Sequence, residues 1–175
     1  MIGKWAQWYK GITKMSSFRY GNTKTYKLAE GFLKGLSVED WGCGTGGFKR
    51  LHHGPYRGID GTETPFTDVV ADLREYQSKT EGIIMRHVLE HNYDWERVLV
   101  NALNSFTKRF CLILFTPFTE ETKEIAHNLK HGVDVPDLSF QKAELEWFLK
   151  GMEFEMETHQ TKTAYGVEHI YYIEK

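Results

Sequence analysis

The sequence has little cysteine and no long apolar run, and each shortage excludes a class of protein. Its 175 residues include two cysteines, Cys43 and Cys111, too few for the disulfide framework of a small secreted domain. No apolar stretch approaches the ~20 residues that cross a bilayer, and the first residues lack the apolar segment of a secretory signal. We therefore expect a cytoplasmic protein without a membrane partner, folded as one structural domain.

The sequence also lacks a surplus of positive charge. Its formal net charge of -2 argues against non-specific binding to nucleic acids, which needs a basic excess. Basic residues are concentrated at the start, where residues 1–34 carry seven Lys and Arg against one acid, Glu30. We expect residues 1–35 to form an aromatic and basic arm with a helix, covering a site on a domain of residues 36–175. The alternative is an arm whose aromatic rings pack on the core. The basic charge of the arm also makes a nucleic acid a possible partner.

Glycine is concentrated in one stretch, residues 36–48. A short apolar run leads to Asp40, and glycine then occupies Gly42, Gly44 and Gly46. Neither a strand nor a helix continues through this density of glycine, so the stretch predicts a strand, a tight turn and a helix starting near Phe48. No Lys-Ser or Lys-Thr follows, which excludes the phosphate-binding loop of nucleotide triphosphatases. A glycine turn without a ligand is the alternative.

Strands alternate with helices along the rest of the chain. Apolar periodicity and capping residues predict helices over 23–34, 48–53, 94–106, 119–130 and 141–150. The expected strands span 36–40, 56–60, 68–72, 82–85 and 109–115, followed by a loop over 133–138 and an antiparallel pair of 154–158 and 170–173. This alternation predicts an α/β fold, a mostly parallel sheet with helices on both faces.

Several of the early strands end in a polar side chain. The residues are Asp40, Asp60, Asp72, Arg86 and His87. Polar groups gathered at one edge of a sheet are costly unless a ligand or water uses them. Ligands of open α/β sheets bind at the carboxyl ends of the strands, so we expect the functional site there.

From about Lys34 onward the chain resembles the class I S-adenosylmethionine-dependent methyltransferases. Residues 38–46 resemble the first motif of that family, Asp/Glu-x-Gly-x-Gly-x-Gly after a strand. Residues 85–91 resemble the segment after the fourth strand of its small-molecule members, and residues 115–117 resemble the end of their fifth strand. The resemblance implies a Rossmann-like, seven-stranded sheet whose last strand is antiparallel.

The resemblance also implies a cofactor, S-adenosyl-L-methionine, and its contacts. Asp60 matches the acid that holds the ribose hydroxyls, and Asp72 matches the acid near the adenine amino group. The residues expected to contact the cofactor are Tyr20, Asp40, Gly42, Cys43, Gly44, Asp60, Gly61, Asp72, Leu73, Arg86 and His87.

The sequence departs from the family members that methylate DNA. No Asn/Asp-Pro-Pro-Tyr follows the fourth strand and no Pro-Cys nucleophile is present. The chain has little inserted sequence for a separate recognition domain. A small-molecule acceptor is therefore favoured, and its identity stays open.

The segment after the fourth strand supplies the candidate catalytic residues. His87 and His91 lie where the acceptor of a methyl group approaches, and imidazole titrates near neutral pH. We expect one of them to act as a base or to orient the acceptor, with Glu90 orienting the histidine. In the alternative interpretation, Glu90 and His91 fix the turn beneath the site.

Two further functions are compatible with the same residues. His87 to His91 reads His-x-x-Glu-His, an arrangement that binds zinc in one class of hydrolases, with Glu120, Glu121 or Glu124 as a third ligand. That function leaves the glycine turn and the strand-end acids unexplained, so we expect no metal site. The other possibility is a non-catalytic module that binds S-adenosylmethionine.

Overall fold

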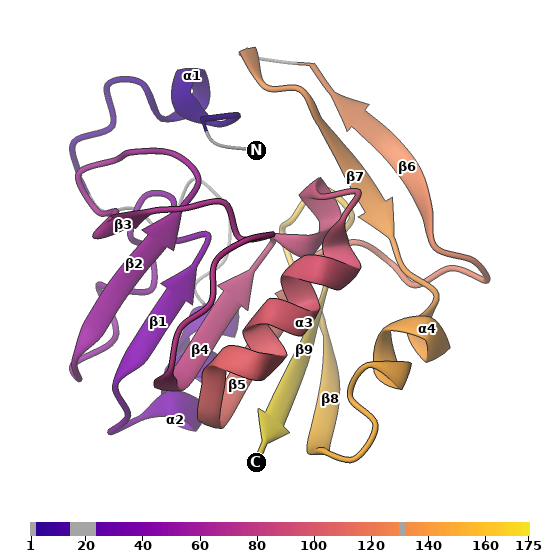
Figure 1. Ribbon diagram of the computed structural model, residues 1–175. Coiled ribbons are helices and arrows are strands. Elements are labelled where there is room, and N and C mark those ends of the chain that lie inside the picture. The colour runs from indigo at the N-terminus through magenta and orange to yellow at the C-terminus, as the bar shows by residue number, and fades with distance from the viewer. Residues whose placement is uncertain (1–2, 15–23, 130–131) are drawn as a thin grey trace.

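A seven-stranded sheet forms the centre of the computed structural model, which describes residues 3–14, 24–129 and 132–175 (Figure 1). Its spatial order is β3-β2-β1-β4-β5-β9-β8. The strands are β1 (Val38–Trp41), β2 (Tyr56–Asp60), β3 (Val69–Val70), β4 (Thr80–Arg86), β5 (Phe106–Leu114), β8 (Glu153–Gln160) and β9 (Val167–Glu174).

Strand directions follow the expectation from sequence. β1 pairs in parallel with β2 and β4, and β3 and β5 extend the parallel set on either side. β9 runs antiparallel to both of its neighbours, β5 and β8. The predicted fold, a mostly parallel seven-stranded sheet closed by an antiparallel last strand, is confirmed.

Helices cover both faces of this sheet. The helices are α1 (Ala6–Tyr9), α2 (Lys24–Leu33), the 3-10 helix η2 (Leu89–His91), α3 (Trp95–Ser105) and α4 (Lys142–Trp147). α2 packs on one face, where it buries Ala29 and Leu33 against Ile84. α3 and α4 pack on the other, against Ile83 and its neighbours. Successive residues of a strand face opposite sides, so β4 contributes to both layers of the core. None of the helices in the described part of the chain combines the length and the apolar composition that crossing a membrane requires.

Three of the predicted segments are wrong, the helices over 48–53 and 119–130 and the loop over 133–138. Residues 45–51 form a run of turns, so no helix starts at Phe48. Gly54 and Pro55 end this segment too soon for a helix to propagate. The described residues of the helix expected over 119–130 are not helical either. β6 (Lys123–Asn128) pairs antiparallel with β7 (Val135–Ser139), where a loop over 133–138 was expected. Every residue of β7 is buried, and this tertiary packing overrides the helix propensity of the preceding segment.

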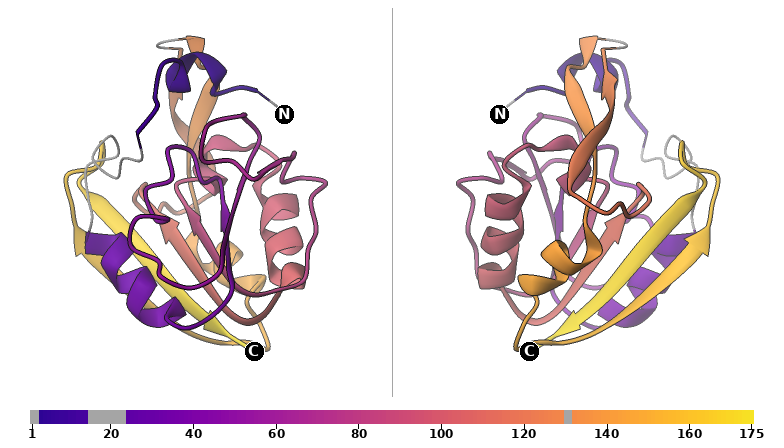
Figure 2. Two further views of the ribbon diagram at one scale, coloured as in Figure 1. Left: turned by 90° about the vertical axis from the view of Figure 1, so that its left-hand side faces the viewer. Right: turned by 90° about the vertical axis from the view of Figure 1, so that its right-hand side faces the viewer.

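The β6–β7 hairpin and α1 lie together above the carboxyl ends of the parallel strands (Figure 2). β7 packs on η2. A Cβ atom built on Gly132 would lie 2.9 Å from Cβ of Gln7, so the hairpin meets α1 closely. Two segments from distant parts of the chain therefore lie over the edge at which the sequence predicts a site.

Candidate active site

A cavity of about 430 Å³ lies at the carboxyl ends of the parallel strands. Its volume is in the range of small-molecule sites. The residues predicted from sequence that line it are Gly42, Cys43, Gly44, Asp60, Gly61, Asp72, Leu73, Arg86, His87 and His91. The structure thus brings together residues from four strand ends in one concave site.

The glycine turn has a conformation and a closeness of packing that only glycine permits. Gly42 and Gly44 have φ angles of 81° and 49°, in the left-handed region. A Cβ on Gly42 would lie 2.3 Å from Cγ2 of Val88, and a Cβ on Gly44 would lie 2.7 Å from the hydroxyl of Tyr9. The turn borders the cavity, and Tyr9 of the N-terminal arm lies directly above Gly44.

Asp60 fixes the end of β2 against this turn. Its Oδ2 accepts a hydrogen bond from the backbone N–H of Gly44 at 2.9 Å, and its Oδ1 accepts one from Thr62 at 2.8 Å. Burial raises the pKa of Asp60 to about 6, against the two backbone hydrogen bonds and Lys4, which lower it. A carboxylate oxygen has two lone pairs, so each oxygen of Asp60 can also accept from a hydroxyl in the cavity.

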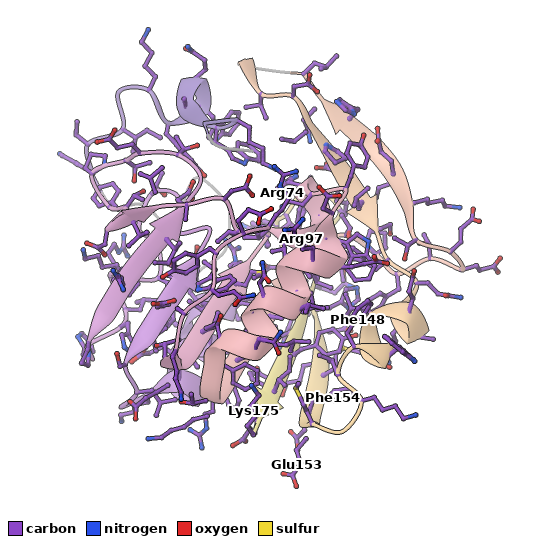
Figure 3. All side chains as sticks on the ribbon, in the orientation of Figure 1. Arg74, Arg97, Phe148, Glu153, Phe154 and Lys175 are labelled. Carbon is purple, nitrogen blue, oxygen red and sulfur yellow. The ribbon has the colours of Figure 1, made fainter. Side chains whose placement is uncertain are left out.

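Asp72 is held by an arginine of the following turn. Nε and Nη2 of Arg74 donate to the two carboxylate oxygens at 3.0 and 2.7 Å, and Nη1 reaches Asp94 at 2.9 Å. Figure 3 labels Arg74 beside the start of α3. The hydrogen bonds from Arg74 hold the pKa of Asp72 well below its usual range. Asp72 therefore presents a charged acceptor, of fixed orientation, at the cavity wall.

Among the described residues, two that the sequence predicted for the site do not line the cavity, Asp40 and Glu90. Asp40 lies within β1, one residue before the turn, and its carboxyl accepts the hydroxyl of Tyr56 at 2.8 Å. Burial raises the pKa of Asp40 to about 7. Glu90 is fully buried in η2, where its Oε1 accepts the backbone N–H of Phe115 at 2.6 Å. Tyr20 lies outside the described residues.

His87 is tied to the last strand of the sheet. It has a φ of 57°, rare for a residue with a side chain, and its Nε2 lies 2.7 Å from Oε1 of Glu168 on β9. Arg86 donates to the same oxygen from Nε at 3.0 Å and from Nη2 at 2.8 Å. Burial and then the charge of Arg86 lower the pKa of His87 to about 3, although Glu168 opposes them. His87 is therefore a neutral imidazole that donates to Glu168.

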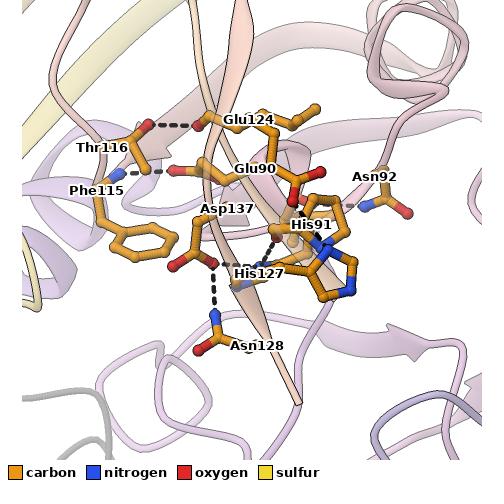
Figure 4. Close-up of polar contacts among 12 residues, drawn as sticks. Glu90, His91, Asn92, Phe115, Thr116, Glu124, His127, Asn128 and Asp137 are labelled. Atoms are coloured by element: carbon orange, nitrogen blue, oxygen red, sulfur yellow. Dashed lines mark hydrogen bonds and ion pairs between the residues drawn. The ribbon is translucent and has the colours of Figure 1, made fainter. Parts of the chain in front are cut away.

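His91 is held from the hairpin instead. Its Nδ1 lies 2.9 Å from the carbonyl of Pro136 and 3.2 Å from Oδ1 of Asp137 on β7 (Figure 4). The rings of Trp5 and Phe115 lie 5.0 and 5.5 Å from the imidazole. Neither histidine is hydrogen-bonded to Glu90 in the part of the chain that the structure describes.

This arrangement does not form a zinc site. Residues 89–91 are a 3-10 helix, and His87 and His91 bond to carboxylates of different strands. Within residues 3–14, 24–129 and 132–175, no group of three or more His, Cys, Asp or Glu side chains has the geometry of a metal site. Glu124, one suggested third ligand, instead bonds to Tyr93 and His127.

The N-terminal arm is attached on both sides of the cavity. Nζ of Lys4 donates to the carbonyl of His91 at 2.7 Å and to the side chain of Asn92 at 2.9 Å. On the opposite side, the N–H of Gly3 donates to the carbonyl of Gly61 at 2.6 Å. Burial lowers the pKa of Lys4 to about 8. The arm therefore forms one wall of the cavity.

Several solved structures of S-adenosylmethionine-dependent methyltransferases share this architecture. Magnesium protoporphyrin IX methyltransferase from Synechocystis, with SAH bound, has 18% sequence identity and a TM-score of 0.65 over 98% of this chain and 94% of that chain. The 1,6-didemethyltoxoflavin-N1-methyltransferase of Burkholderia thailandensis has 15% identity and a TM-score of 0.63 over 86% and 76%. A possible histamine N-methyltransferase from Thermotoga maritima has 14% identity and a TM-score of 0.61 over 90% and 91%.

The chain has the fold of the class I methyltransferases. No model of a protein family matches its sequence, and no curated protein sequence matches it either. The identities of 14 to 18% show the fold alone.

Within this methyltransferase fold, several cavity residues were not found from the sequence. They come from the arm and from the segments after β5: Trp5, Tyr9, Asn128, Asp137 and Lys162. The partners of the two histidines, Glu168 and Asp137, were also missed. The aromatic residues of the arm gave a signal in the sequence that could have placed Trp5 and Tyr9 in the cavity. Asp137 gave no such signal, because it lies in a segment that was expected to be a loop.

Proposed function

We propose that the chain is an S-adenosylmethionine-dependent methyltransferase that acts on a small-molecule acceptor. The observation that carries the proposal is the hydrogen bond between Gly44 and Asp60 at the wall of the cavity. It joins the glycine turn of the first motif to the acid after the second strand, the two features on which the resemblance to the family rests. Structures of similar fold that contain SAH support the same ligand here.

The residues present fit this cofactor. Gly42 and Gly44 line the cavity without side chains, and Asp60 retains lone pairs for a pair of ribose hydroxyls. Asp72 offers a charged acceptor to an amino group. When bound, the cofactor supplies a methyl group that is already activated by a sulfonium. The protein then contributes mainly position and alignment.

The other part of the cavity suits a small acceptor. Trp5 and Phe115 supply aromatic walls, while His91, Asn128 and Asp137 supply polar groups. A cavity of about 430 Å³ that the arm and the hairpin border favours a small molecule over a nucleic acid strand. Lys4, one of the basic residues of the arm, is already used in anchoring it.

Calorimetry with SAH tests the proposal directly. We expect a dissociation constant in the micromolar range, which corresponds to a free energy of binding of about -8 kcal/mol. The absence of binding to a folded sample would contradict it. A methylated product formed by the isolated chain would separate an enzyme from a non-catalytic module that only binds the cofactor.

We also propose a cytoplasmic location, because both cysteines are free and buried.

A further inference from the structure

The contacts of His91 point to a base for the methyl transfer, a role that rests on the proposed function. His91 lines the cavity, and its Nδ1 faces two acceptors, the carbonyl of Pro136 at 2.9 Å and Oδ1 of Asp137 at 3.2 Å. Both acceptors require a proton on Nδ1. A neutral imidazole carries one N–H, so Nε2 of His91 is left with a lone pair. Nε2 makes no hydrogen bond to the described residues.

Asp137 is itself held firmly as a carboxylate. Its Oδ2 accepts the hydroxyl of Tyr165 at 2.8 Å, and its Oδ1 accepts the side-chain amide of Asn128 at 2.9 Å. Burial acts to raise the pKa of Asp137, but the hydrogen bonds from His91 and Tyr165 outweigh it and hold the pKa below its usual value. A buried carboxylate on Nδ1–H orients an imidazole and stabilises the imidazolium that forms when Nε2 takes up a proton.

His87, the other candidate, is placed differently. Its Nε2 donates to Oε1 of Glu168, and Arg86 and Thr25 donate to the same oxygen. The positive charge of Arg86 therefore largely neutralises this carboxylate. Arg86 next to His87 disfavours a second positive charge at this point. The hydrogen bond from His87 to Glu168 instead links the end of β4 to β9, which is a structural role.

We propose that His91 is the general base of the methyl transfer, that Asp137 positions it, and that the acceptor is a hydroxyl compound. A neutral amine attacks with its own lone pair, whereas a hydroxyl gains from loss of its proton during attack. The acceptor oxygen forms a bond to the methyl carbon as the bond between that carbon and the sulfonium sulfur breaks. The electron pair of that bond stays on sulfur, and the hydroxyl proton moves to Nε2 of His91.

The tautomer of His91 provides a test that does not depend on turnover. Protein labelled with ¹⁵N-histidine, with SAH bound, is examined by NMR at alkaline pH, where the imidazole is neutral. We expect a protonated Nδ1 and an unprotonated Nε2 for His91. In Asp137→Asn the His91 signals should move, because the carboxylate charge facing Nδ1 is lost while the Pro136 carbonyl still holds the proton there. The matched control Asp134→Asn, which changes an exposed carboxylate on His127, should leave the His91 signals unchanged. A proton on Nε2 in the native protein, or native signals in Asp137→Asn, would overturn the proposal.

A labelling experiment tests the acceptor class. The protein is given methyl-labelled S-adenosylmethionine with catechol, aniline and thiophenol together. We expect label on catechol oxygen and a loss of at least ~10²-fold in its rate in His91→Gln. Label on nitrogen or sulfur alone would overturn the hydroxyl assignment. The absence of label from all three compounds would overturn it as well.

Calorimetry separates this proposal from the proposed function. His91→Gln and Asp137→Asn should bind SAH with the native affinity if they act on the acceptor alone. Loss of SAH binding in every sample, the native protein included, would instead contradict the methyltransferase assignment itself.

Discussion

The backbone N–H of Gly44 donates a hydrogen bond to Oδ2 of Asp60 at 2.9 Å, joining the turn after β1 to the end of β2. Parallel pairing of these strands places their carboxyl ends side by side. The acid therefore has two roles that the sequence did not separate. It fixes the glycine turn, and it faces the cavity with lone pairs to spare.

Asp60→Ala should weaken SAH binding without unfolding the protein. A carboxylate that accepts ligand hydroxyls contributes roughly 1.5–3 kcal/mol per charged hydrogen bond, so we expect a loss of about 10- to 100-fold in affinity. Calorimetry measures the affinity, and thermal unfolding confirms that the variant is folded. Glu63→Ala, which removes an exposed acid nearby, is the matched control. Native affinity in a folded Asp60→Ala would mean that Asp60 serves the turn alone.

Gly44→Val should abolish SAH binding. A β-branched side chain is poorly suited to a φ of 49°, and its Cβ would lie 2.7 Å from the hydroxyl of Tyr9. Combining Gly44→Ala with Tyr9→Phe separates the two possible causes. If the ligand crosses this turn, binding stays weak after the hydroxyl is removed. Recovery of binding in the double variant would assign the effect to displacement of the arm.

The sheet could be predicted from the sequence because its strands are marked locally. Each of the five parallel strands contains a short apolar run that is followed by a polar residue, a glycine turn or a proline, and strands occur at all five places in the structure, β1 to β5. The β6–β7 hairpin could not be predicted in the same way. Residues 119–130 are rich in good helix formers, and only the burial of β7 on η2 selects a strand there.

The cofactor side of the site was more predictable than the acceptor side for the same reason. Gly42, Gly44 and Asp60 follow strands in sequence, so local pattern places them. The partners of the histidines come from distant segments: Asp137 lies on the unforeseen hairpin, and Glu168 on the last strand. No spacing in the sequence relates either carboxylate to residues 87–91, since tertiary contacts alone bring them together.

The protein should contain no stoichiometric zinc. His87 and His91 bond to separate carboxylates on β9 and β7, which directs their rings to different partners. Elemental analysis of protein prepared without a histidine tag measures the metal, and a chelator should leave the SAH affinity intact. One zinc per chain, lost in both His87→Ala and His91→Ala, would contradict the roles assigned to the pair.

The titration of Glu90 should lower the free energy of unfolding of the protein as the pH rises. Burial raises the pKa of this carboxyl to about 8 in the folded protein, and its Oε2 has no hydrogen-bond partner among the described residues. The unfolded chain releases the proton near the ordinary value of 4.5, so the folded state binds more protons between these two values. The contribution of Glu90 is therefore most favourable below pH 4.5 and declines until about pH 8.

The isosteric variant Glu90→Gln isolates this contribution. Glutamine can still accept the N–H of Phe115 but does not titrate. Urea unfolding at pH 5, 7 and 9 should show the variant gaining several kcal/mol relative to the native protein as the pH rises, since each pKa unit is worth about 1.4 kcal/mol. Asp40, whose pKa burial raises to about 7, titrates in both proteins and cancels in the comparison. Parallel stability profiles for the two proteins would show that Glu90 titrates normally, and that the carboxylate is solvated or paired in the folded state.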